Sequence, residues 1–141
     1  LAGGWSKDEA VAATALRRIL DLPDLPISVT RVRAAHFYGL GVSLHADLHE
    51  ALPLEEVRST LRGAPGLLLR DDEDPAEYPT PADVVGEDAT FVGRVRSDED
   101  AACVDAWVGL DNLRKGAAVN AVQIAEILVR ERRPAAIGQH L

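Results

Sequence analysis

Residues 90–110 have the sequence TFVGRVRSDEDAACVDAWVGL, and this stretch decides the fold class. Thr90–Arg96 and Ala102–Leu110 are rich in β-branched and apolar residues, which predicts two strands. The acidic residues 98–100 between them predict a turn or loop. Residues 42–49, VSLHADLH, alternate apolar with polar side chains. This alternation predicts a third strand with one buried and one solvated face.

Further helix and strand signals lie outside this stretch. Ser6 followed by Glu9 has the spacing of a capping box at the start of an amphipathic helix. The residue composition of 27–37 and 66–69 predicts strands, and residues 53–63 predict a short helix between Pro and Gly. We expect an α+β fold, with a mixed, mostly antiparallel sheet and helices packed on one face.

The last predicted element is a long helix over about residues 113–132. Its polar positions form a narrow stripe, and nearly all other positions are apolar. A helix with this pattern must be covered on most sides. We therefore expect a partner subunit, or a part of the polypeptide outside this chain, to cover it.

The composition limits the classes of function. A chain of 141 residues suffices for one domain, and 47% hydrophobic with 27% charged residues is typical of a globular protein. The net charge of −8 argues against binding to nucleic acids or anionic membranes. No apolar run approaches the ~18 residues of a membrane-spanning helix. The single cysteine excludes an internal disulfide and fits a cytoplasmic location.

Few side chains offer chemistry. His45, Asp47 and His49 share one face of a predicted strand, but the two histidines lie ~13 Å apart, too far for one metal ion to bind both. We therefore predict a solvated strand face and no metal site. Cys103 lies among apolar residues, which predicts a buried side chain rather than a nucleophile.

Two pairs of arginines occupy alternate positions in predicted strands, Arg31 with Arg33 and Arg94 with Arg96. Such a pair can clamp a carboxylate or phosphate. It can equally form surface ion pairs with the many acidic residues, which is the interpretation that the sequence favours. Residues 39–41, Gly-Leu-Gly, lack the third glycine of a phosphate-binding fingerprint, so we interpret them as a turn.

Four segments together resemble one family. They are residues 20–33 (LDLPDLPISVTRVR), 78–83 (YPTPAD), 91–96 (FVGRVR) and 111–126 (DNLRKGAAVNAVQIAE). In this order they are similar to the C-terminal part of aspartate-semialdehyde dehydrogenases. By this resemblance, residues 1–141 form one substrate-binding and dimerisation domain, somewhat less than half of a full-length family member.

The resemblance implies a two-domain enzyme that reduces aspartyl phosphate through a thioester. Its N-terminal domain binds NADP, and its second domain carries a cysteine nucleophile, a histidine base and the dimer contact. The long C-terminal helix packs on the nucleotide domain, which this chain lacks, so we expect no cofactor in this chain. The resemblance assigns Arg33 and Asp8 to substrate binding and Asn112 to a position beside the cofactor.

The chain departs from the family pattern at the chemical positions. Leu40 occupies the position of the general-base histidine, and Val11 occupies that of a substrate-binding lysine. Cys103 does not match the nucleophile. Leucine has no atom that can accept a proton, so general-base catalysis by residue 40 is impossible. His36 follows Arg33 by three residues in a predicted strand, which would place the two side chains on opposite faces.

These departures lead to a first hypothesis, a catalytically inactive member with a role in dimerisation or scaffolding. The partner would be a second copy or a full-length relative. The alternative is part of an NADP-dependent oxidoreductase of altered chemistry whose N-terminal half is not in this chain. In neither case does the sequence show a catalytic residue.

Overall fold

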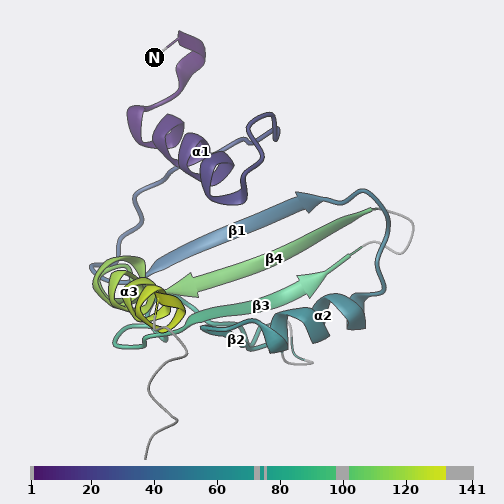
Figure 1. The fold of residues 1–141 in the computed structure, drawn as a ribbon. Helices are drawn as coiled ribbons and strands as arrows, with labels where there is room; N and C mark the ends of the chain where they lie inside the picture. Colours follow the sequence, from purple (N-terminus) through teal and green to yellow (C-terminus); the bar gives the residue numbers. More distant parts are fainter. Residues whose placement is uncertain (1, 72–73, 75, 98–101, 133–141) are drawn as a thin grey trace, which may run out of the picture. The chain divides into compact units, whose positions relative to one another are not determined.

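The computed structural model describes residues 2–71, 74, 76–97 and 102–132, and the chain divides after Ala35 into two compact units. Its elements are η1 (Ala2–Gly4), α1 (Lys7–Leu20), β1 (Leu40–Asp47), α2 (Leu54–Gly63), β2 (Leu67–Leu69), β3 (Thr90–Arg96), β4 (Cys103–Leu110), η2 (Arg114–Ala118) and α3 (Val119–Arg132) (Figure 1). The predicted α+β class, with a mixed sheet, is confirmed. The predicted turn at residues 98–100 lies outside the described residues.

The first unit consists of α1 and the extended chain that follows it. The capping box is confirmed, because the Ser6 hydroxyl accepts from the Glu9 amide while the Glu9 carboxylate accepts from the Ser6 amide. The helix ends at Asp21, whose φ of 55° is left-handed. Most of the apolar side chains of this amphipathic helix are exposed, including Val11, Leu16 and Ile19, whereas Ala13 is buried.

The predicted strand over residues 27–37 is wrong. This segment is extended but has no strand assignment. The amide of Arg31 donates to the Glu9 carboxylate at 2.8 Å instead of to a neighbouring strand. A side chain of α1 thus provides the hydrogen bond that a sheet would otherwise supply.

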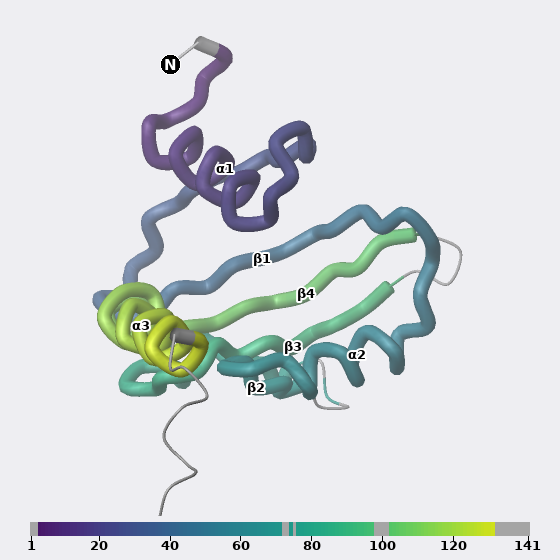
Figure 2. The backbone as a smooth tube through the Cα atoms, in the orientation of Figure 1, coloured from purple at the N-terminus to yellow at the C-terminus, as the bar shows by residue number. Residues whose placement is uncertain are grey.

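The second unit is built on a four-stranded sheet with the order β1-β4-β3-β2. β1 pairs antiparallel with β4, β4 pairs antiparallel with β3, and β3 pairs parallel with β2 (Figure 2). The predicted strand over 42–49 is β1, which begins two residues earlier, at Leu40. Its apolar face is not buried as expected, because Leu40, Val42 and Leu44 are exposed in this chain.

One face of the sheet packs against α2, the helix predicted at residues 53–63. Val92, Val95 and Ala106 form the buried centre of this layer. The α2 side chains Leu54, Val57 and Leu61 pack on them, together with neighbouring strand residues. α2 packs on β2 and β3, and it does not cover β1, which is the strand at the opposite edge of the sheet.

The opposite face of the sheet is covered by coil rather than by a helix. The carbonyl of Pro79 accepts from the Trp107 indole nitrogen at 2.8 Å. Gly93 and Gly109 face this coil, where an added Cβ would lie 3.0 Å or less from atoms of Pro79. The absence of side chains at these two glycines therefore allows the coil to lie directly on the sheet.

A bulge in β3 changes the arginine pair predicted on this strand. The register with β4 shifts between Gly93 and Arg96, and Arg94 has a left-handed φ of 52°. The Arg94 guanidinium lies over the Tyr78 ring, whereas Arg96 lies 3.9 Å from Asp105. The extra residue breaks the alternation of the strand, so Arg94 and Arg96 do not form a clamp; the contact of Arg96 with Asp105 agrees with the surface ion pairs that the sequence favoured.

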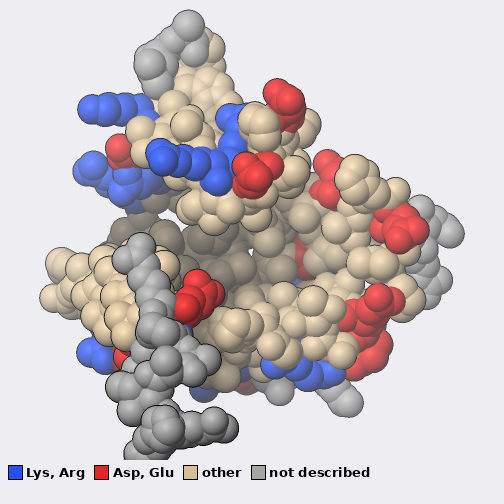
Figure 3. Space-filling view, in the orientation of Figure 1, with Lys and Arg blue, Asp and Glu red and all other residues tan. Residues whose placement is uncertain are grey.

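The long helix predicted over residues 113–132 is present, with a wider first part. In η2, the amides of Gly116 and Ala118 bond to carbonyls five residues earlier, and α3 continues the helix. The surface of α3 is mostly uncharged in the space-filling view (Figure 3).

Within the described part of the chain, no helix has the length and apolarity needed to cross a bilayer.

Candidate functional site

Leu40, which the resemblance assigns to the position of the family's base, begins β1 directly after Gly39. The Gly39 amide donates to the Asn112 side-chain oxygen at 2.9 Å. Gly39 has a φ of 87°, and a Cβ at this position would overlap the Pro81 carbonyl oxygen. Leu40 pairs with Leu110 of β4, and its side chain is 45% exposed. The backbone around residue 40 is therefore held from two segments distant in the sequence.

Asn112, predicted to lie beside a cofactor, has a structural contact in this chain. Its side-chain oxygen is engaged by Gly39, at the junction between β4 and η2. The described residues contain no glycine-rich loop between a strand and a helix that would hold a pyrophosphate.

Asp111 is the central polar residue of this region, and our sequence analysis did not identify it. It is 5% exposed, and one carboxylate oxygen accepts from the amides of Leu113 and Arg114 at 2.8 and 2.9 Å. The other oxygen accepts from the Gly86 amide at 2.9 Å. The pKa of Asp111 is lowered, most strongly by the hydrogen bonds that its carboxylate accepts from the backbone amides of Gly86 and Arg114. An aspartate at the start of a predicted helix is a capping signal that would have indicated part of this role.

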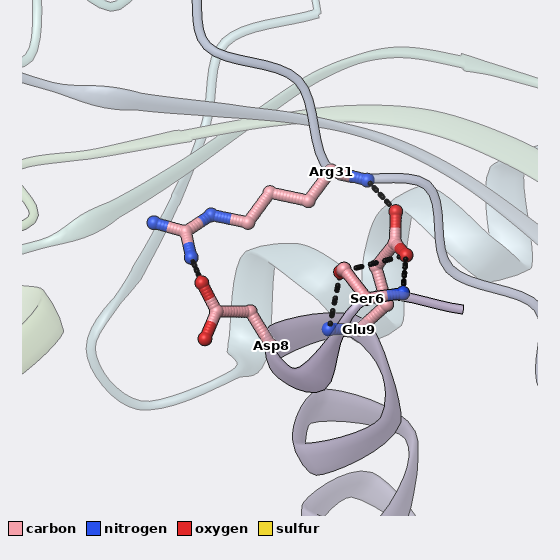
Figure 4. Close-up of polar contacts among 4 residues, drawn as sticks. All are labelled: Ser6, Asp8, Glu9 and Arg31. Carbon is pink, nitrogen blue, oxygen red and sulfur yellow. Dashed lines mark hydrogen bonds and ion pairs between the residues drawn. The ribbon is translucent and has the colours of Figure 1, made fainter. Parts of the chain in front are cut away.

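The predicted substrate residues Asp8 and Arg33 lie in the first unit. The Asp8 carboxylate forms an ion pair with the Arg31 guanidinium (Figure 4). The Arg31 amide and the capping contacts of Ser6 hold the neighbouring Glu9 carboxylate and lower its pKa. Arg33 is exposed and forms no hydrogen bond or ion pair with the residues that the structure describes. The Asp8 carboxylate is therefore paired with Arg31 and does not face an open binding surface.

The histidine and cysteine positions lie at the other end of β1 and β4. The Nδ1–H of His45 donates to the Asp105 carboxylate at 2.9 Å, and its second ring nitrogen, Nε2, lies 3.4 Å from the Asp47 carboxylate. The pKa of His45 is raised, and the main cause is its hydrogen bond to Asp105. Cys103, predicted to be buried, is half-buried opposite Asp47 in the strand register. No three potential ligands among the described residues are placed to hold a metal ion.

Known structures identify the class of protein to which this fold belongs. The aspartate-semialdehyde dehydrogenase II of Vibrio cholerae matches this structure with a TM-score of 0.85 and 36% sequence identity. The match covers 94% of this chain and 39% of that one. The fold is therefore that of the C-terminal domain of this class of dehydrogenases.

Sequence comparison identifies the family. The profile of the semialdehyde dehydrogenase dimerisation domain matches residues 4–115, and the chain belongs to this family. A USG-1 protein homolog of Azotobacter vinelandii is 45% identical over 119 residues, or 83% of this chain. The aspartate-semialdehyde dehydrogenase of Aquifex aeolicus is 40% identical over 129 residues, or 91% of this chain. The aligned chain spans 34% and 38% of the lengths of these two relatives, respectively.

Proposed function

We propose that this chain is a non-catalytic semialdehyde-dehydrogenase-type domain that serves as an assembly subunit. The observation that carries this proposal is Leu40, whose alkyl side chain occupies the position assigned to the proton-accepting histidine. Loss of a general base costs ~10²–10⁴-fold in rate. The contacts of Gly39 with Asn112 and Pro81 preserve the backbone around this position without a reactive side chain.

The first unit supports the same proposal. The Asp8 carboxylate is neutralised by Arg31, so it is not free to bind a cationic group of a substrate. Val11, at the position assigned to a substrate-binding lysine, is 59% exposed and carries no charge. Asp8, at the position assigned to the acid, and Val11, at the position assigned to the lysine, are therefore both unsuited to binding an amino-acid-derived substrate. Arg33 remains exposed.

A domain without turnover can persist for its packing and its contacts with other subunits. The matched family is a dimerisation domain, and an isologous interface accepts a second copy or a closely similar subunit. We propose a homodimer, or a heterodimer with a full-length relative, in the cytoplasm. The NADP chemistry of the dehydrogenases would then be supplied by the relative and not by this chain.

An activity assay tests the loss of catalysis. The complete gene product is incubated with aspartate semialdehyde, phosphate and NADP, and NADPH formation is followed. We expect turnover at least about 10²-fold below that of a full-length aspartate-semialdehyde dehydrogenase assayed in parallel, because the base position cannot accept a proton. Turnover that the Arg33→Ala variant abolishes would refute the proposal and would favour an oxidoreductase of altered chemistry.

Sedimentation velocity tests the assembly role. We expect the purified protein to sediment as a dimer, or to do so when a full-length aspartate-semialdehyde dehydrogenase from the same organism is added. A monomer at all concentrations, with and without that enzyme, would contradict the proposal.

A further inference from the structure

Charged and titratable side chains form a row across three strands, on the sheet face opposite α2. Asp47 and His45 lie in β1, Asp105 lies in β4 and Arg96 lies in β3. The strand register places His45 directly opposite Asp105, and Asp105 opposite Arg96. Ala106, the next residue of β4, packs in the layer under α2, so Asp105 projects from the other face. The row therefore alternates between carboxylates and groups that carry or can carry a positive charge.

His45 lies between two carboxylates. Its Nδ1 is 2.9 Å from a carboxylate oxygen of Asp105, and its Nε2 is 3.4 Å from a carboxylate oxygen of Asp47. Each ring nitrogen therefore faces an acceptor. A neutral imidazole carries one N–H and can donate to one of these carboxylates, whereas the imidazolium ion carries two N–H groups. The two contacts are thus available together only to the protonated ring.

Arg96 is a second cation beside Asp105. Its Nε lies 3.9 Å from the carboxylate oxygen of Asp105 that does not contact His45. This separation is within the range of an ion pair but is too long for a hydrogen bond. The Asp105 carboxylate is therefore shared between a close contact to β1 and a looser contact to β3.

The other titratable groups near this row are few among the described residues. The thiol of Cys103, in β4, lies opposite Asp47 in the strand register. Arg94, in β3, is engaged over the Tyr78 ring. The acidic residues 98–100, between β3 and β4, lie outside the described residues. Protonation of the imidazole is therefore the change that alters the charge of the row near neutral pH.

The row lies at the end of β1. Asp47 is the last residue of this strand, and the amide of the next residue, Leu48, donates to the Ala102 carbonyl at 2.7 Å. β1 is an edge strand, and β4 is its one neighbour in the sheet. The side-chain contacts of His45 therefore connect this end of β1 to β4, beside the backbone hydrogen bond of Leu48.

We propose that His45, Asp47 and Asp105 form a proton-dependent clasp that holds the end of β1 against β4. The imidazolium ion holds both carboxylates. When the ring loses its proton, Asp47 loses its donor, and Arg96 remains as the cation beside Asp105. The end of β1 then separates from β4 more often. This inference concerns the conformation of the sheet and does not depend on the assembly role proposed above.

The direction of the response follows from the charges around the ring. The hydrogen bond to Asp105 is the main cause that raises the pKa of His45 above its ordinary value of about 6.5. A group whose pKa is raised by folding stabilises the folded state fully below its ordinary pKa. It loses this contribution as the pH rises through the raised value. The clasp should therefore be closed in mild acid and released as the pH rises above about 6.5.

Nuclear magnetic resonance on the complete protein tests the clasp. The carbon-bound ring protons report the titration midpoint of each histidine, and we expect His45 to titrate at a higher pH than the exposed His49. We then expect the Leu48 amide to exchange about twofold to fivefold faster about one pH unit above the His45 midpoint than about one unit below it, as for the loss of exposed ion pairs. The exchange rates are corrected for the intrinsic pH dependence of amide exchange.

A matched pair of variants assigns the effect to this ring. His45→Gln keeps a polar side chain that does not titrate, and it should abolish the pH dependence of the corrected Leu48 exchange. His49→Gln removes an exposed histidine two positions beyond the strand and should leave this dependence unchanged. Arg96→Gln removes the second cation beside Asp105, so it should raise the titration midpoint of His45.

Three results would each overturn the clasp. One is a His45 midpoint no higher than that of His49. Another is a corrected Leu48 exchange rate that is equal on both sides of the His45 midpoint. The third is a pH dependence of this rate that persists in His45→Gln. An unchanged His45 midpoint in Arg96→Gln would overturn the sharing of Asp105 between the two cations.

Discussion

Asp111, Asn112 and Gly39 hold the backbone around residue 40 through contacts between residues far apart in the sequence. The Asp111 carboxylate joins the start of the C-terminal helical segment to Gly86, and the Asn112 amide joins it to Gly39. These contacts require no catalytic side chain at residue 40. At the residue scale, the polar groups that position the chain are therefore separable from the groups that would perform chemistry.

The pH dependence of stability tests the role of Asp111. Its pKa is lowered in the folded state, so its contribution is present above the ordinary aspartate value of about 3.9 and is lost as the pH falls through the folded-state value. We expect Asp111→Asn to destabilise the second unit at pH 7 and to flatten the loss of stability in acid. In a Trp5→Phe background, denaturant unfolding monitored by Trp107 fluorescence measures both. The exposed Asp24→Asn variant is the control and should keep the wild-type slope.

Gly39 and Gly86 form a matched pair for testing the contact with Pro81. Both have a left-handed φ, but a Cβ on Gly39 would overlap the Pro81 carbonyl, whereas a Cβ on Gly86 would meet nothing within 4 Å. We expect Gly86→Ala to lower the free energy of unfolding by about 1 kcal/mol through backbone strain alone. Gly39→Ala should cost about 1–3 kcal/mol more, because the coil must also move. Equal losses in the two variants would show that the Pro81 contact is unimportant.

At the element scale, short-range patterns predicted most helices and strands. These patterns affect only residues a few positions away in the sequence. They are the capping box at Ser6, the proline and glycine around α2, and the apolar runs of β3 and β4. The strand predicted at residues 27–37 failed because strand-like sequence does not guarantee a strand partner. Its Arg31 amide bonds to a side chain of α1.

α3 is the element whose environment differs most from what its sequence demands. Its apolar side chains are exposed, including Val122, Ile124 and Val129, and it contacts mainly η2. An isolated helix of this length is marginal in water. We expect its amides to exchange with deuterium faster than those of β4 in the isolated chain, and to slow when a covering domain or subunit is present. Exchange as slow as that of β4 in a monomer would contradict this prediction.

At the scale of the whole molecule, the two units have very different cores. The second unit buries the cluster of Val92, Val95 and Ala106 and, outside this cluster, Phe91, whereas Ala13 is the buried apolar residue described in the first. A unit with so little buried surface gains little stability from the hydrophobic effect. The first unit should therefore unfold before the second.

The two tryptophans allow this order to be measured. Trp5 lies in the first unit and Trp107 in the second, where its indole donates to Pro79. In a Trp5→Phe variant, fluorescence reports the second unit alone, while loss of α-helix by circular dichroism also reports α1. We expect the circular dichroism signal of the helices to begin falling at a lower denaturant concentration than the fluorescence of Trp107. Coincident transitions would show that the units unfold as one.

The sequence by itself determined most local elements, the α+β class and, through its resemblance to the dehydrogenases, the family. Such features depend on neighbours within one or two turns of chain, which composition and spacing record. The tertiary structure alone decided that Arg31 pairs with Asp8, that Asp111 bonds to Gly86 and that β1 lies at the sheet edge. All three are set by packing, ion pairing or hydrogen bonding between segments more than twenty residues apart, and no local pattern encodes which distant group will satisfy a given amide or carboxylate.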